Sequence, residues 1–399
     1  MRIAVYNLYW TTYGGGEQVA GAIAEVLSQD HEVDVLGPEP VDVARMRARL
    51  GADLSRCGYR TVVDDDGASA ASADYDVLVT TTYLSKAVNR APVGLYYAHF
   101  PEEGKTRAEE RRAWVRERVV PLLDRAPYLP GRARTVRNEM AGRIVDRSFL
   151  ATYQSVIANS AFTAHWIHEY WGVEPDVLYP PVRMLPALPK RNLIVSVGRF
   201  FSPAFGHCKK QLDLVLAFRS LALSGRADGW EYHLVGGCDH KNREYFNDVR
   251  RAALGLPVEI HLNAPGEVVQ ELVGAASVFW HGGGYGEDLT MHPHRAEHFG
   301  IAVVEGMSSG AVPVVFGAAG PAEIVRDGID GYHWHTPTEL QARTAALIAS
   351  PADRARLGAS AALRARDFGT AVFAANLHGL LDEAADRSTG RPASGRGSS

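Results

Sequence analysis

The sequence is poor in cysteine and has no long apolar segment. Its three cysteines, Cys57, Cys208 and Cys238, are an odd number, lie far apart and form no C-x-x-C pair. Neither a disulfide framework nor a cysteine zinc or redox pair is therefore predicted. No uninterrupted apolar run is long enough to span a bilayer. The segment MRIAVYNLYW enters a strand pattern without a signal-peptide core, so we expect a cytoplasmic protein.

An excess of charge of one sign is also missing. The 42 Lys and Arg residues against 46 Asp and Glu residues give a formal net charge of -4, so no nucleic-acid partner is expected. Hydrophobic residues make up 46% and charged residues 22% of the 399 positions, a balance typical of globular proteins. This length favours two domains.

Short apolar runs alternate with segments of helical periodicity along the chain. RIAVYN (2–7) predicts a strand, the segment after Gly14–Gly16 predicts a helix, and EVDVLG (32–37) predicts a second strand. Comparable strand patterns recur in both halves, at 76–82, 93–100, 155–160, 193–200, 231–237, 258–263, 277–283 and 312–317. The alternation predicts an α/β protein with two parallel sheets and helices on both faces.

A proline-rich segment separates the two series of strands. VLYPPV (177–182) cannot continue a helix or a central strand, and Pro186 and Pro189 follow it. We therefore place the domain boundary there. The predicted units are residues 1–182, residues 183–365, a helix at 366–386 that returns to the N-terminal domain, and a disordered tail at 387–399.

Two glutamates define the most informative segment, EHFGIAVVEGMSSGAVPVVF. Glu297 and Glu305 are eight positions apart and flank Phe299-Gly300-Ile301, with a helix predicted from about Gly300 to Ser309. The N-terminus of that helix would suit a diphosphate, because its backbone N–H groups lack partners within the helix. Glu305 could then reach a ribose while Glu297 faces a sugar. Taken alone, the pair would favour a helix-capping acid and a solvated residue.

The surrounding motifs identify a family resemblance. GGGEQVA (14–20), SVGRF (196–200) with a lysine downstream, and GAVPVVFGAAGPAEIVRDGIDGY (310–332) occur in the order found in the retaining glycosyltransferases of family 4. That family shares an E-x7-E pattern and has the GT-B fold, which is α/β with two facing Rossmann-like domains, parallel sheets and an interdomain cleft. AHFP, ANSAFTAHWI and VLYPPV further resemble cytosolic-face mannosyltransferases that extend the dolichol-linked oligosaccharide.

The resemblance implies roles for particular residues in the C-terminal, donor-binding domain. Glu297 would contact the transferred sugar, Glu305 would hold the ribose, and Gly300 and Ile301, beside Phe299, would present N–H groups to the phosphates. Arg199 and Lys209 would hold the diphosphate. Counting back from the predicted helix at 211–223 favours Lys209 over Lys210, although an ordinary solvated lysine pair is the alternative. Asn263 would meet the nucleobase through backbone atoms.

The N-terminal, acceptor-side domain would contribute a glycine loop and a histidine. Gly15 and Gly16 would let a ligand approach the backbone closely. His99, at the carboxyl end of a predicted strand, would contact the donor sugar or position the acceptor, although a structural role is the alternative.

No metal site and no cofactor are predicted. The spacing of His281, His292, His294 and His298 is unlike that of a zinc site, and no cysteine joins them. Asp64–Asp66 are assigned to a solvated loop. The basic stretch at 107–147 contains a predicted amphipathic helix at 106–125, for which we prefer a solvated face over contact with anionic lipid or a phosphorylated acceptor.

The resemblance implies a metal-independent, retaining hexosyltransferase. Its donor would be a nucleotide-sugar, GDP-mannose first and a UDP-sugar as a close second. Its acceptor would be a hydroxyl of a small molecule or a lipid-linked sugar, with peripheral contact at the inner membrane face as one option. A sugar phosphorylase, a nucleotide-sugar epimerase and a non-catalytic nucleotide-binding protein remain alternatives.

Overall fold

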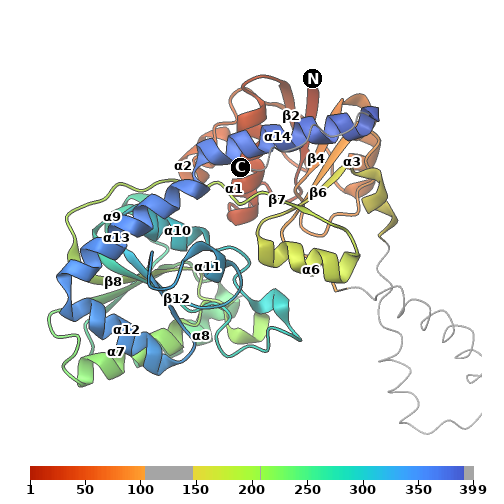
Figure 1. Cartoon of the computed structure of the whole chain (residues 1–399). Coiled ribbons are helices and arrows are strands. Elements are labelled where there is room, and N and C mark those ends of the chain that lie inside the picture. Colours follow the sequence, from red (N-terminus) through yellow and green to blue (C-terminus); the bar gives the residue numbers. More distant parts are fainter. Residues whose placement is uncertain (104–146, 207, 391–399) are drawn as a thin grey trace, which may run out of the picture.

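Strands and helices alternate along the described residues, which are 1–103, 147–206 and 208–390 of a computed structural model (Figure 1). The predicted helix at 106–125 and nearly all of the basic stretch lie outside these residues, as does the end of the predicted tail. None of the helices in the described ranges combines the length and apolar character that a bilayer crossing requires.

The first sheet has seven parallel strands in the order β3-β2-β1-β4-β5-β6-β7. Its strands are β1 (Arg2–Tyr6), β2 (Glu32–Gly37), β3 (Gly58–Thr61), β4 (Val77–Thr80), β5 (Val93–Ala98), β6 (Ser155–Ala158) and β7 (Asp176–Val177). Helices of this half are α1 (Gly15–Leu27), α2 (Val43–Leu50), α3 (Asp65–Ala71) and α6 (Ala161–Trp171). The central strands are buried on both faces, as uninterrupted apolar runs predict.

The second sheet has six parallel strands in the order β10-β9-β8-β11-β12-β13. Its strands are β8 (Arg191–Val197), β9 (Glu231–Gly236), β10 (Val258–Leu262), β11 (Ala276–His281), β12 (Val312–Phe316) and β13 (Tyr332–Trp334). The helices are α7 (Gln211–Leu223), α8 (Arg243–Ala252), α9 (Gly266–Ala275), α10 (Ile301–Ser308), α11 (Ala319–Ile324), α12 (Pro337–Ala349) and α13 (Pro351–Ala365). The predicted α/β class with two parallel sheets is confirmed.

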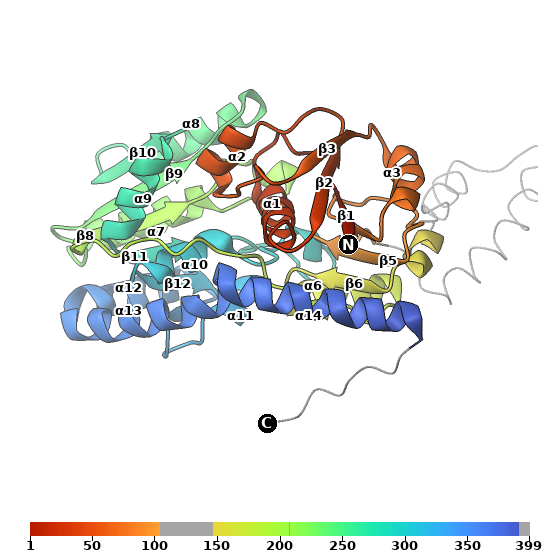
Figure 2. The ribbon, with the colours of Figure 1, turned by 90° about the horizontal axis from the view of Figure 1, so that it is seen from above.

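The last helix, α14 (Thr370–Thr389), leaves the second half and packs on the first (Figures 1 and 2). Its buried face joins the core of β1, β4 and β5 through Phe373, Leu377, Leu380 and Leu381. The helix continues three residues past the predicted end at 386, where Arg387 donates to the carbonyl oxygen of Gln154 at 2.9 Å. A polar contact to the first sheet therefore holds residues that the sequence assigns to the tail.

A carboxylate of the second half caps a helix of the first. The side chain of Glu323, in α11, accepts hydrogen bonds from the backbone N–H groups of Ala161 (2.9 Å) and Phe162 (2.5 Å) at the start of α6. Beside this cap, the ring of His298 stacks on Phe100 at a centroid distance of 4.2 Å. Such contacts fix how the two halves face each other in this structure.

We predict that Leu377→Ala lowers the free energy of unfolding by roughly 2–5 kcal/mol, because Leu377 is fully buried and the smaller side chain would leave a cavity. Chemical denaturation followed by circular dichroism measures this. Val372→Ala, on the exposed side of the same helix, should change stability far less. Equal losses in the two variants would contradict the packing of α14 on the first sheet.

Candidate functional site

A cleft of about 580 Å³ lies between the two halves of the molecule. It is lined from one side by the segments after β1, β4 and β5, and from the other by the segments after β8 and β11 and by the start of α10. In each sheet the strand order reverses at one point, between β1 and β4 and between β8 and β11. Open parallel sheets bind ligands at the carboxyl ends of the strands beside such a point.

The cleft brings together nine of the eleven predicted site residues. From the first half these are Gly15, Gly16 and His99, and from the second half Arg199, Lys209, Glu297, Phe299, Gly300 and Ile301. Glu305 and Asn263 are not among the residues that line it.

An ion pair between Lys209 and Glu297 stands at the centre of this set. The carboxylate of Glu297 also lies 3.0 Å from Nε2 of His281, the last residue of β11. Burial alone would raise the pKa of Glu297, but the positive charge of Lys209 and the His281 ring hold that pKa well below its usual range. Glu297 is therefore ionised at neutral pH and can accept hydrogen bonds from a ligand.

The neighbouring lysine has a different environment. Lys210, buried and in the left-handed conformation at the start of α7, pairs with Glu287 at 2.6 Å, and Arg295 approaches the same carboxylate at 3.0 Å. This pair ties the loop before α7 to the loop after β11. The structure thus turns Lys209 toward the cleft and Lys210 away from it.

Arg199 lies in the loop directly after β8, with its guanidinium 4.5 Å from the ring centre of Phe201. The side-chain amide of Gln211 donates to the carbonyl oxygens of Gly198 (3.2 Å) and Arg199 (3.0 Å), which fixes the course of the loop. A Cβ at Gly198 would lie 2.7 Å from Cγ of Lys209. A glycine is needed there because the lysine passes directly over the backbone.

The N-terminus of α10 faces the cleft next to these cations. Gly300, with φ of 116°, precedes the helix and turns the chain so that Ile301 and Ala302 line the cleft. The start of α10 agrees with the predicted helix. Its first-turn N–H groups and the positive end of the helix dipole favour an anion.

The glycine loop opposite α10 allows the two halves to approach closely. A Cβ at Gly15 would lie 3.3 Å from Cδ1 of Ile301, and one at Gly16 would lie 3.3 Å from Cε1 of His99. Glu17, in the first turn of α1, accepts from the backbone N–H of Gly14 at 2.7 Å, which is the glutamate half of a capping box, since glycine has no side chain to accept in return. The cap fixes the shape of the loop, and both of its residues line the cleft.

His99 is held by one backbone group and one side chain, which directly follow the two neighbouring strands. Its Nε2 lies 2.8 Å from the carbonyl oxygen of Thr81, so this nitrogen donates, and the side-chain amide of Asn159 donates to the His99 carbonyl oxygen at 2.9 Å. Burial lowers the pKa of His99, against the opposing effects of the Thr81 carbonyl and Glu17. The ring is therefore neutral at pH 7, with Nδ1 as a hydrogen-bond acceptor.

The two predicted residues outside the cleft lining occupy adjacent elements. Glu305, in the second turn of α10, is partly buried, and burial raises its pKa to about 7 while Arg183 opposes the rise. Asn263 follows β10 with φ of 53°, and its backbone N–H donates to the carbonyl oxygen of Gly236.

Several cleft residues were not predicted. His281, Asn159 and Thr81 each stand at or just after the end of a strand, a position that the sequence pattern could have flagged. Tyr9 and Tyr83, about half exposed, lie in loops after β1 and β4 and gave no comparable signal.

The assignment of Asp64–Asp66 to a solvated loop was right about exposure at Asp64 and Asp66 but wrong about the loop and about Asp65. Asp64 caps α3, and the carboxylate of Asp65 accepts hydrogen bonds from the Tyr6 hydroxyl at 3.0 Å and the Ser85 hydroxyl at 2.7 Å. These donors come from other strands and loops, so no local pattern shows them.

Comparison with known proteins finds similarity both in sequence and in fold. Residues 185–364 match the family described as glycosyl transferases group 1. A GDP-Man:Man(3)GlcNAc(2)-PP-Dol alpha-1,2-mannosyltransferase of Dictyostelium discoideum is 29% identical over 198 residues, which is 44% of this chain and 37% of that protein. The human protein of that name is 28% identical over 182 residues, 42% of this chain and 34% of its own length. The matched segment thus spans about a third of these relatives.

The fold is shared over the whole chain. Anabaena HepE, solved in complex with UDP and glucose, is 14% identical, aligns with 96% of this chain and 99% of its own, and has a TM-score of 0.63. The chain therefore has the GT-B fold, with two Rossmann-like domains that face each other across the cleft, and it resembles mannosyltransferases in sequence.

We predict that Lys210→Met lowers the free energy of unfolding by roughly 3 kcal/mol, because the buried carboxylate of Glu287 loses a charged partner. Urea denaturation measures the change. Lys241→Met, which removes an exposed lysine, is the control and should be close to neutral. An equally small effect of both variants would show that the pair does not hold the loop.

A second prediction concerns pH. Because Glu305 has a higher pKa in the folded state than in the unfolded chain, the wild-type protein loses stability as pH rises from about 4.5 to about 7. Glu305→Gln lacks this loss and should be more stable than wild type by roughly 2 kcal/mol at pH 8, with little difference at pH 4.5. Denaturation at several pH values tests this. Glu271→Gln, at an exposed position of α9, should run parallel to wild type, and a parallel profile for Glu305→Gln would refute the idea.

Proposed function

We propose that this chain is a metal-independent, retaining glycosyltransferase that moves a hexosyl group from a nucleotide-sugar to an acceptor hydroxyl. The observation that carries the proposal is the meeting of Arg199, Lys209, Glu297 and the N-terminus of α10 in one cleft. Two cations and a helix N-terminus suit a diphosphate, and an ionised glutamate beside them suits the hydroxyl groups of a sugar. The glycosyl transferases group 1 match covers this part of the chain.

In the reaction that we propose, Arg199, Lys209 and the α10 N-terminus stabilise the diphosphate as it leaves. The bond between the anomeric carbon and the phosphate oxygen breaks, and the acceptor oxygen bonds to that carbon from the same face. The acceptor proton passes to the departing phosphate oxygen. Preorganised cations lower the barrier because they are in place before the negative charge develops.

Glu297 has two tasks in this proposal. It accepts hydrogen bonds from the transferred sugar, and its ion pair keeps Lys209 directed into the cleft. His281 orients the carboxylate from behind. As the family resemblance implies, Glu305 would contact the ribose and Asn263 the base. Both residues lie outside the cleft lining, so these parts of the donor would lie beyond it.

The donor that we favour is GDP-mannose, with a UDP-sugar as a close second. The names of the matched relatives specify GDP-Man, whereas HepE was solved with UDP and glucose. For the acceptor we propose a sugar hydroxyl, free or lipid-linked. Tyr9 and Tyr83 line the acceptor side of the cleft as exposed aromatic rings, a surface on which a sugar ring can pack. A cytoplasmic location, with peripheral contact at the inner membrane face, stays a prediction.

We predict that Arg199→Ala and Lys209→Ala each lower the rate of sugar transfer about a hundredfold, because each removes a charge that stabilises the leaving diphosphate. The assay follows release of nucleoside diphosphate from a panel of nucleotide-sugars, and NMR of the product reports its anomeric configuration. Arg219→Ala, an exposed arginine of α7, is the matched control and should retain wild-type rates. Full activity of Arg199→Ala, or an inverted product, would contradict the proposal.

Ligand screening separates the alternatives before any acceptor is known. A ligand that binds only the folded state raises the melting temperature, so GDP, UDP, ADP and dTDP are compared with inorganic phosphate and sugar phosphates. Stabilisation by one nucleoside diphosphate supports a transferase. Stabilisation by phosphate alone points to a phosphorylase, and conversion of the donor sugar without an acceptor points to an epimerase.

A further inference from the structure

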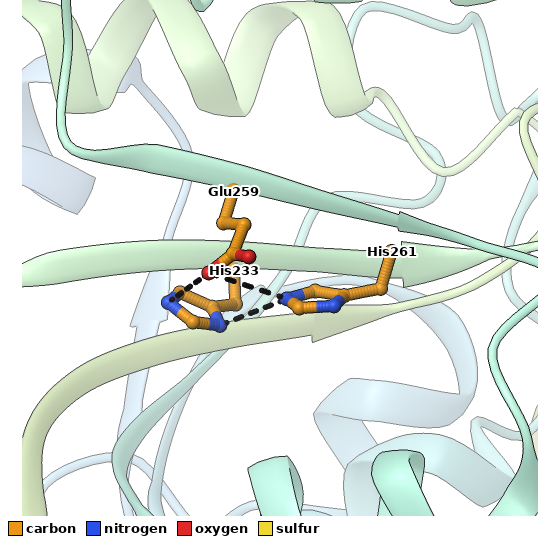
Figure 3. A group of neighbouring side chains, drawn as sticks. All are labelled: His233, Glu259 and His261. Atoms are coloured by element: carbon orange, nitrogen blue, oxygen red, sulfur yellow. Dashed lines mark hydrogen bonds and ion pairs between the residues drawn. The ribbon is translucent and has the colours of Figure 1, made fainter.

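A second group of polar side chains lies away from the cleft, at the outer edge of the six-stranded sheet. His233 of β9 and Glu259 and His261 of β10 converge there, with one possible ligand atom from each within 4.8 Å of the others (Figure 3). None of the three lines the cleft. We propose that this group, the edge cluster, binds a single zinc ion that ties β10 to β9.

Strand register explains why the three side chains meet. Glu259 is paired directly with His233, and His261 is two residues further along β10, on the same face of the sheet. Glu231, two residues before His233, belongs to this face as well. A shift of one residue in the register of β10 would send both Glu259 and His261 to the opposite face.

The distances fit tetrahedral coordination. Nε2 of His261 lies 3.0 Å from Nδ1 of His233 and 3.8 Å from Oε2 of Glu259. Ligand atoms about 2.05 Å from a zinc ion at tetrahedral angles are roughly 3.3 Å apart, which is close to these two distances. Oε2 of Glu259 also lies 3.5 Å from Nε2 of His233, so the exposed glutamate side chain must swing toward Nδ1 of that ring to complete the site. Two imidazoles and one carboxylate are ligands that zinc favours, and water would supply the fourth.

A carboxylate is also in place to orient one of the ligands. Nε2 of His233, the nitrogen that the zinc ion would not use, lies 3.4 Å from Oε2 of Glu231. Histidines that bind metal usually donate their second N–H to such a group, which fixes the tautomer. Arg191 holds Glu231 in turn, at 3.1 Å. This arrangement extends the edge cluster across β8, β9 and β10.

Burial is graded across the edge cluster in a way that suits a metal site. The side chain of His233 is 6% exposed, that of His261 18% and that of Glu259 66%, so an ion could enter from solvent past the glutamate. Below the cluster, Val195 and Val235 continue the apolar core on the same face of the sheet. The alternative is a neutral histidine pair that shares one hydrogen bond and serves packing alone.

Binding would exchange a hydrogen bond for metal coordination. The proton between the two imidazoles moves to a nitrogen that the zinc ion does not use, and each ring remains neutral with one N–H. The ion then cross-links an edge strand to its only neighbour in the sheet. It would also hold the end of β10, two residues before Asn263.

The test uses the untagged full-length chain, dialysed against EDTA and then titrated with ZnCl2 by calorimetry. We expect one zinc ion per chain, and at least tenfold weaker binding after His261→Gln or Glu259→Gln. Glu259 is exposed, so its variant should fold even if the histidine variant does not. His378→Gln is the control, because His378 belongs to no group of three potential metal ligands in the described part of the chain.

A second measurement distinguishes zinc binding at the edge cluster from adventitious binding to cysteine or surface histidine. Zinc should slow hydrogen exchange of the β10 amides in wild type and in His378→Gln, and leave them unchanged in Glu259→Gln. Zinc affinity that both edge-cluster variants retain, or no saturable binding by wild type, would overturn the proposal. The edge cluster lies outside the cleft, so these results do not depend on whether the chain transfers sugar.

Discussion

The parallel direction of all strands in both sheets is the constraint on which the cleft depends. It places every strand's carboxyl end at one edge of its sheet, so the segments that follow the strands gather there. The two edges face each other, and the cleft therefore receives groups from both halves. The sheets are parallel because helices connect successive strands and cover both faces, and this is why the central strands are apolar throughout.

Within the cleft, one ion pair organises the charges. Lys209 is directed by Glu297, Glu297 is oriented by His281, and the loop that carries the lysine is fastened by the separate Lys210–Glu287 pair. Adjacent lysines thus serve different purposes, one facing the cleft and the other buried. Positive charge is thus already held beside the α10 N-terminus before a ligand binds. Electrostatic preorganisation requires charges that are in place in this way.

The sequence predicted the fold class and most strands, because buried parallel strands read as short apolar runs. It missed β3 and β13, whose residues Gly58–Thr61 and Tyr332–Trp334 contain too few aliphatic side chains to stand out. Residues that line the cleft were predicted where a motif marks them, as at Glu297 and Gly300. His281 and the edge cluster depend on burial and strand register, which residues far apart in the sequence determine together.

The chain crosses between the halves twice, once after β7 and again before α14. The two crossings lie side by side, because the backbone N–H of Val182 donates to the carbonyl oxygen of Phe368 at 2.9 Å and Val182 pairs with Gly369. Because this bridge joins the two crossings, any shift of one half against the other has to move both segments together.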